Sequence, residues 1–550
     1  MGVCFAGLRK ICGVPSQSTQ EPDLMSLNLS PEDVSAARET QQFQTQMGQI
    51  SRHSAVFFVG TIFRIGAGYL FKVYLARTLG PEPLGIYALG MTIVGFLGVF
   101  NGLGLPQAAV RFVAHYTASG KTEQLRQFLV SATGLILAAN VALGLTVLGV
   151  GPWVAAHFYH TPALSPYLKF FALIMMLGAL STFFAKVLQG YKEVSRLTVI
   201  TDFVGTPLTI LASGVLITWG AGLRGYVVAQ VISAAAVLAL LLRLVWKLTP
   251  PAARPLQSKV WRPESQVLSF SATVLGIGLL DFLAGQSDRI LIGFYMNARN
   301  LGIYAVASAV VAYIPIALQS VNQIFSSTIA DLHTRGERQL LGRLYQTLTR
   351  WVLAFTLPLA VVIMVFARPL MRIFGADFEA GWLVLIIGTV GQLVNCGVGS
   401  VGYLLLMSGN ERRLIKVQAV AAVVTAGLSF ALVPQWGIVG AAVASAATNI
   451  LTNLWNLAQS HRLFGFLPYN RRSLRLLLPT AVCTIVVLLT KAMFHNVGRT
   501  WVGIVVSLLL AYAVFLGVSL GSGFDADDRL IGRAMWAKIK GFLPMIDVGA

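Results

Sequence analysis

Five charged side chains fall within long apolar stretches of this 550-residue chain, and their types define the chemistry to be explained. Arg64 and Lys72 lie in one stretch, and Asp281, Asp288 and Arg289 lie in another. A charge at the centre of a bilayer costs about 2.5 to 3.5 kcal/mol on insertion scales, so it needs a water-filled cavity or a partner. Guanidinium and ammonium groups bind phosphate oxygens. We therefore expect the three cations to bind an anionic substrate and the two carboxylates to be candidates for ion coupling.

The spacing of these charges places them on shared helix faces. The two cations of the first stretch are eight residues apart, which is about 80° around a helix, and the two carboxylates are seven apart and nearly eclipsed. Lys186 and Asp202, near predicted helix ends, are secondary candidates. The alternative is internal pairing, in which Asp288 neutralises a basic group on a neighbouring helix and Lys72 extends to the membrane surface.

The composition indicates the elements that must position these charges. Hydrophobic residues make up 56% of the chain and charged residues only 11%, against about 25% charged residues in soluble domains. Apolar runs of about 20 residues recur, which suits helices that cross a ~30 Å hydrocarbon core. The net charge of +20 lies mostly in loops that flank these runs, as membrane topology requires, so we do not expect nucleic-acid binding. The predicted fold class is an all-α polytopic membrane protein.

The apolar runs predict fourteen transmembrane helices. Alternate connections carry most of the basic residues, which places both termini in the cytoplasm. The predicted spans are 54–77, 82–105, 125–150, 163–188, 196–219, 222–247, 265–294, 300–325, 345–368, 379–407, 412–432, 437–460, 474–494 and 498–521.

The sequence contains an internal repeat. The pentapeptide LGIYA occurs at 84–88 and again at 301–305, an offset of 217 residues, which aligns Lys72 with Arg289 and Arg64 with Asp281. GLRG at 222–225 and GIVG at 437–440 each begin the sixth helix of a set, at an offset of 215. An even number of spans per set predicts parallel repeats, related by an axis along the membrane normal.

This repeat divides the chain into two pseudo-symmetric halves with additional segments. We expect a polar cytoplasmic tail at 1–52, an N-lobe of helices 1–6 at 53–247, a proline-rich cytoplasmic linker at 248–264, a C-lobe of helices 7–12 at 265–460, helices 13 and 14 at 461–521, and a cytoplasmic amphipathic tail at 522–550.

No constellation typical of an enzyme is present. The four cysteines are too dispersed for a metal site or a disulfide framework. His157 and His160 have no third ligand nearby, and no Walker A, hydrolase or dinucleotide-binding motif occurs. We expect no enzymatic activity, no metal and no cofactor, apart from a coupling H⁺ or Na⁺.

The segments YLARTLGPEPLGIYALG at 74–90 and SDRILIGFYMNARNLGIYAVAS at 287–308 resemble the beginnings of the two halves in Wzx-type polysaccharide flippases, members of the multidrug/oligosaccharidyl-lipid/polysaccharide exporter superfamily. The resemblance extends over about 54–521. It implies two six-helix lobes in a V around a central cavity, with two further C-terminal helices and alternating access. Cavity arginines and lysines are typical of the family, and Arg64, Lys72 and Arg289 lie on the matching helices.

The resemblance also implies a substrate and a location. Family members move undecaprenyl-pyrophosphate-linked oligosaccharides across the bacterial inner membrane during O-antigen, capsule or exopolysaccharide synthesis, so membrane lipids, a polysaccharide polymerase and glycosyltransferases are the expected partners. One alternative is a cation-coupled drug exporter of the MATE kind, which would be expected to carry an acid in its first helix. Another is a scaffold for glycan-assembly enzymes that transports nothing.

Overall fold

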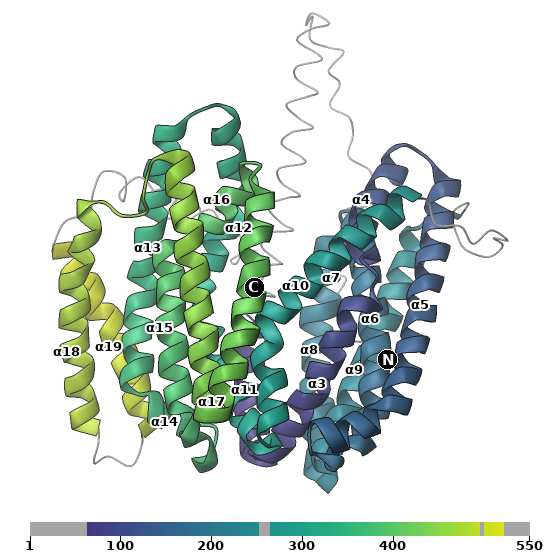
Figure 1. Ribbon diagram of the computed structural model, residues 1–550, viewed down its shortest axis with the longest axis horizontal. Coiled ribbons are helices and arrows are strands. Elements are labelled where there is room, and N and C mark those ends of the chain that lie inside the picture. Colours follow the sequence, from purple (N-terminus) through teal and green to yellow (C-terminus); the bar gives the residue numbers. More distant parts are fainter. Residues whose placement is uncertain (1–62, 252–264, 495–499, 522–550) are drawn as a thin grey trace, which may run out of the picture. The chain divides into compact units, whose positions relative to one another are not determined.

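A computed structural model describes residues 63–251, 265–494 and 500–521. Within these ranges every regular element is a helix (Figure 1). Nine helices of the described part are long and apolar enough to span a membrane, or ten if the bent pair Ala298–Val311 and Ile316–Asn322 counts as one. The all-helical, polytopic class is therefore confirmed. The count of fourteen and the V-shaped grouping of the lobes stay predictions, and the predicted tails at 1–52 and 522–550 lie outside the described residues.

The first half of the described chain begins with a helix over residues 63–79. The helices that follow in this half are α3 (Pro81–Asn101), α4 (Leu105–Ala118), α5 (Thr122–Trp153), α6 (Leu168–Gly190), α7 (Val194–Thr198), the π-helical η4 (Val199–Gly205), α8 (Thr206–Leu216), the π-helical η5 (Ile217–Ala221) and α9 (Gly222–Leu248). The short η2 (Val154–Phe158) and η3 (Pro162–Tyr167) connect α5 to α6.

The second half repeats this plan. Its helices are α10 (Ser265–Tyr295), α11 (Ala298–Val311), α12 (Ile316–Thr334), α13 (Arg338–Val365), α14 (Ala367–Arg372), η7 (Ala376–Gly381), α15 (Trp382–Val398), α16 (Val401–Met407) and α17 (Glu411–Phe464). The chain continues through η8 (Arg471–Leu476) to α18 (Leu477–Phe494) and α19 (Thr500–Gly521), which pack against each other and against α13. Helix α10 lies beside α17 (Figure 1) and also contacts α3.

Two of the candidate spans, 194–248 and 411–464, are 55 and 54 residues long, more than twice the roughly 20 residues that a bilayer requires. Each is broken at a glycine with the same backbone conformation: Gly222 has φ 50° and ψ −133°, and Gly437 has φ 58° and ψ −135°. Only glycine adopts this region without strain. The two breaks fall at the repeat-related positions that the sequence indicated, so each long element is a pair of helices joined by a tight turn.

The two halves meet where α3 crosses α11, and the contact is reciprocal. A Cβ atom on Gly85 would lie 1.6 Å from the carbonyl oxygen of Ala298, and one on Gly302 would lie 1.9 Å from that of Pro81. Gly85 and Gly302 are equivalent at the offset of 217, as are Pro81 and Ala298. Each half thus contributes the same two positions to the contact, as at a two-fold interface. The backbones touch directly because neither glycine carries a side chain.

The predicted second span requires a correction. The sequence pattern indicated one helix over 82–105, followed by a loop that extends to 125. Instead, the backbone breaks at Gly102–Gly104, where Leu103 and Gly104 have φ of 50° and 70°, and a further helix, α4, continues to Ala118. The sequence pattern missed α4 because its exposed positions are polar and lower the mean hydropathy of the segment.

We predict that Gly302→Ala destabilises the protein more than Gly178→Ala does. The first substitution places a methyl group against the Pro81 carbonyl, whereas a Cβ on Gly178 meets nothing within 4 Å. Forcing atoms into a packed contact costs about 1–3 kcal/mol, while alanine in an open helical position is favourable. Thermal unfolding of the purified protein in detergent would measure the difference, and equal melting temperatures for the two variants would contradict the backbone contact.

Candidate functional site

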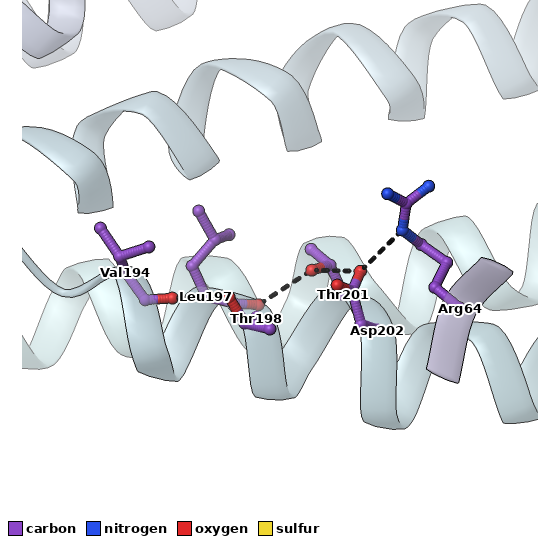
Figure 2. Close-up of polar contacts among 6 residues, drawn as sticks. All are labelled: Arg64, Val194, Leu197, Thr198, Thr201 and Asp202. Atoms are coloured by element: carbon purple, nitrogen blue, oxygen red, sulfur yellow. Dashed lines mark hydrogen bonds and ion pairs between the residues drawn. The ribbon is translucent and has the colours of Figure 1, made fainter. Parts of the chain in front are cut away.

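Arg64 lies in the first described helix and forms an ion pair with a carboxylate in η4 (Figure 2). Its Nε is 3.6 Å from Asp202 Oδ1, and the two side chains are 55% and 12% exposed. The Thr201 hydroxyl lies 3.2 Å from the same carboxylate oxygen. Phe63 and Phe203 stack beside the pair, with ring centroids 5.5 Å apart. A half-exposed pair of this kind contributes about 0–1 kcal/mol, and it orients Arg64 while its terminal nitrogens remain accessible.

The second half contains the counterpart of this pair with different chemistry. Asp281, equivalent to Arg64, is exposed on α10 and accepts a 3.1 Å hydrogen bond from the Gln418 amide on α17. The offset between Asp202 and Gln418 is 216 residues, between the 217 of the first helices and the 215 of the sixth. In each half, therefore, the first helix contacts the fifth at the same place. The contact is a cation with an anion in one half and an anion with an amide in the other.

Lys72 and Arg289, which the repeat aligns, belong to different halves. Their positive charges are close enough to interact unfavourably, and among the described residues neither has a carboxylate at ion-pair distance. Arg289 Nη1 donates to Gln286 Oε1 at 3.0 Å. Its Nε is buried without a hydrogen-bond partner in the described part of the chain. Two like charges within electrostatic range of each other, one with an unsatisfied donor, are suited to binding an anion.

Asp288 is buried on α10, with 8% of its surface exposed, and hydroxyl groups rather than cations surround it. The Tyr304 hydroxyl donates to its Oδ2, as does Ser445 Oγ at 3.0 Å. The backbone N–H of Arg289 donates to Oδ1 at 2.8 Å. These donors join α10, α11 and α17, and they replace the basic partner that the ion-pairing alternative required.

The first half has no carboxylate at the equivalent place. At the repeat offsets the three positions of this cluster correspond to Phe71, Tyr87 and Gln230. The Gln230 amide donates directly to the Tyr87 hydroxyl at 2.8 Å, and Phe71 packs against Tyr226 with ring centroids 6.0 Å apart. The geometry of the cluster is thus duplicated, but the group that can carry a proton or bind a cation occurs in the second half.

The remaining candidate, Lys186, lies on α6. Lys186 donates to Gln189 at 3.1 Å within its own helix. Within the described ranges no three His, Cys, Asp or Glu side chains are grouped to hold a metal ion. Sequence reasoning did not identify Tyr304, Ser445 or Tyr313, whose ring lies 5.7 Å from Lys72 Nζ. For Tyr313, the in-span Pro315 was a signal that could have directed attention to the segment.

Comparison with known proteins places these features in context. A family model described as polysaccharide biosynthesis protein matches residues 74–380. The chain is 21% identical over 403 residues to the probable low-salt glycan biosynthesis flippase Agl15 of Haloferax volcanii, covering 72% of this chain and 80% of that protein. It is 24% identical over 403 residues to the lipid III flippase of Escherichia coli, covering 71% and 93%.

Solved structures share the fold. The lipid II flippase MurJ, in its inward closed conformation, superposes with a TM-score of 0.69 at 15% identity, over 84% of this chain and 98% of that one. An inward-facing multidrug resistance MATE family transporter gives a TM-score of 0.60 at 15% identity, over 72% and 94%. At this identity the likeness establishes the fold alone, and flippases and drug exporters share it.

We predict that Tyr304→Phe lowers the free energy of unfolding by about 1.5–3 kcal/mol, because it removes a hydrogen bond to a charged group that is buried. Tyr403, which is 36% exposed, supplies the control, since Tyr403→Phe at the surface should change stability by less than about 0.5 kcal/mol. Thermal unfolding of both variants in the same detergent tests this. A Tyr304→Phe variant as stable as the wild type would mean that the hydroxyl does not support Asp288.

Proposed function

Because this chain belongs to the polysaccharide biosynthesis protein family, we propose that it is a flippase that translocates an undecaprenyl-pyrophosphate-linked oligosaccharide across the bacterial inner membrane by alternating access. The diphosphate and sugars bind between the two halves while the polyprenyl chain stays in lipid. The protein thereby spares a charged headgroup the passage through hydrocarbon, where each unpaired charge is costly.

The observation that carries this proposal is the pair of repeat-related cations Lys72 and Arg289. They are contributed by the two halves, interact unfavourably with each other, and have no carboxylate at ion-pair distance in the described part of the chain. A diphosphate has two anionic centres, so one phosphate can face each half. The guanidinium also provides a planar set of donors for paired hydrogen bonds to phosphate oxygens. Arg64, held by Asp202, adds a third cation on the first helix.

The same pair explains how substrate binding drives the conformational change. Two like unit charges repel each other, although solvent screens part of this repulsion at the exposed Lys72. When the site is empty, this repulsion opposes any state in which the two halves bring these cations together. A bound diphosphate turns the repulsion into two attractions. The substrate thus binds one state better than another, which is what a ligand must do to shift an equilibrium.

We further propose that Asp288, with Asp281, couples transport to a proton or sodium ion. Asp288 is a buried carboxylate whose described partners are hydroxyl and amide donors, so it lacks a fixed counter-charge. A proton or Na⁺ would neutralise it. Because its donors lie on three helices of the second half, a change in its charge alters how these helices hold together.

The proposal includes a location and partners. We place the protein in the bacterial inner membrane with both termini in the cytoplasm, where glycosyltransferases assemble the substrate. A polysaccharide polymerase would use the product on the outer side. A multidrug exporter with the same fold is less compatible with this site, since its cationic substrates would meet Arg64, Lys72 and Arg289.

We predict that Lys72→Ala and Arg289→Ala each reduce transport at least about tenfold, because a hydrogen bond to a charged group contributes about 1.5–3 kcal/mol. Arg289→Lys should retain part of the activity, since it keeps the charge but loses the paired geometry. The measurement is complementation of a bacterial strain that lacks its own oligosaccharide flippase, read as polysaccharide at the cell surface.

Arg335→Ala serves as the matched control, because Arg335 is an exposed arginine at the C-terminal end of α12 that pairs with Asp331 one turn earlier. Full complementation by all of these variants would mean that Lys72 and Arg289 do not bind the substrate, and a wild type that neither complements nor confers drug resistance would indicate a scaffold that does not transport. If the wild type fails to complement but confers resistance to cationic drugs, the exporter alternative is correct.

For ion coupling, we predict that Asp288→Asn alters the dependence of transport on pH or sodium, with Asp281→Asn producing a smaller change because Asp281 is exposed. Proteoliposomes loaded with substrate and given either a proton or a sodium gradient provide the measurement. If both variants respond to each gradient as the wild type does, neither carboxylate is a coupling site.

A further inference from the structure

Tyr313 occupies a break between two helices at the place where the two halves contact each other. Helices α11 and α12 meet at a bend of 52°, and Pro315, the N-cap residue of α12, has no N–H to continue the helical ladder. The backbone turns through two hydrogen bonds, each to the carbonyl three residues earlier. Tyr313 N–H donates to Val310 O and Ile314 N–H donates to Val311 O, both at 3.1 Å. Broken helices of this kind are a feature of substrate sites in transporters.

The ring of Tyr313 contacts the cationic first helix of the other half. Lys72 Nζ lies 5.7 Å from its centroid, and the Tyr69 ring meets it edge-on, with centroids 5.9 Å apart. Tyr69 is in turn supported by Phe374 at 5.9 Å. Arg64 is also close enough to interact with Tyr313 electrostatically. An aromatic ring held by other rings therefore lies beside the cations assigned to the diphosphate.

Tyr313 remains partly accessible. Its side chain is half-buried rather than enclosed, and its hydroxyl has no hydrogen-bond partner that the described residues provide. An aromatic ring with this surrounding has two uses in a protein. It can shield the neighbouring cation, or it can present a face to a ligand with both apolar and polar character.

On the proposed function, on which this inference rests, a sugar is joined directly to the diphosphate. A sugar ring carries C–H groups on its faces and hydroxyls at its edge, which match the face of an aromatic ring and a free phenolic hydroxyl. We propose that Tyr313 holds the first, phosphate-linked sugar while Lys72 and Arg289 hold the diphosphate. Tyr313 then determines that the protein binds the glycosylated lipid in preference to the bare polyprenyl diphosphate.

The test compares two ligands on the purified full-length protein in lipid nanodiscs: undecaprenyl diphosphate and the same lipid carrying one N-acetylhexosamine. The wild type should bind the glycosylated lipid about tenfold more tightly. Tyr313→Leu should lose this preference by weakening the glycosylated lipid much more than the bare lipid, whereas Tyr313→Phe should keep most of it. Tyr295→Leu is the matched control, since Tyr295 is a partly exposed tyrosine that contacts Phe430 instead.

A second measurement retains an aromatic ring, so it does not depend on the leucine variant folding. Tyr313→Trp should show a fluorescence change, relative to the wild type, with the glycosylated lipid and none with the bare lipid. If Tyr313→Leu weakens both ligands equally, or if the tryptophan responds equally to both, Tyr313 merely shields Lys72 and the inference is wrong. If the wild type binds neither lipid, the proposed function itself fails, and this inference fails with it.

Discussion

The direct backbone contact between α3 and α11 is the constraint on which the described arrangement depends. Gly85 against Ala298 and Gly302 against Pro81 bring the halves together without intervening side chains. The same contact fixes the chain position of the two cations. Lys72 lies nine positions before Pro81, and Arg289 lies nine positions before Ala298. Each cation is on the helix that ends just before the reciprocal contact, so the two lie at the same distance along the chain from it.

The helices of this protein are broken at two kinds of position, which have different surroundings. Backbone groups in hydrocarbon must be satisfied within the chain, so non-helical segments are tolerated where protein or water surrounds them. The turns at Gly222 and Gly437 have the same conformation and join successive spans in the two halves. The break at Tyr313, by contrast, lies beside Lys72. The breaks at Gly222 and Gly437 connect the helices of the fold, whereas the break at Tyr313 places an aromatic ring beside a cation.

Much of this could be predicted from the sequence, because the information lay in repetition and hydropathy. The LGIYA match aligned Lys72 with Arg289 before any contact between them was known. The partners of individual side chains could not be predicted in the same way. Arg64 pairs with Asp202, 138 positions further along, and Asp288 binds Ser445, separated by 157. No periodicity links positions so distant, and a serine or threonine within an apolar span has the same pattern whether or not it holds a carboxylate.

The two halves have diverged in the charged groups that they carry: both keep a cation, but only one has the carboxylate of Asp288. A cation is kept in each half, at Lys72 and Arg289, which is what the proposed binding of a diphosphate by both halves requires. The carboxylate of Asp288 has no counterpart, since Phe71 stands at its equivalent position. The groups around Asp288 suit a change of charge, because a hydroxyl can donate or accept: Tyr304 and Ser445 can donate to the carboxylate and can rotate to accept from the protonated acid. A fixed cation at this position would not allow both states. In the proposed mechanism, the ion therefore acts through Asp288 in the second half, while the substrate connects the two halves.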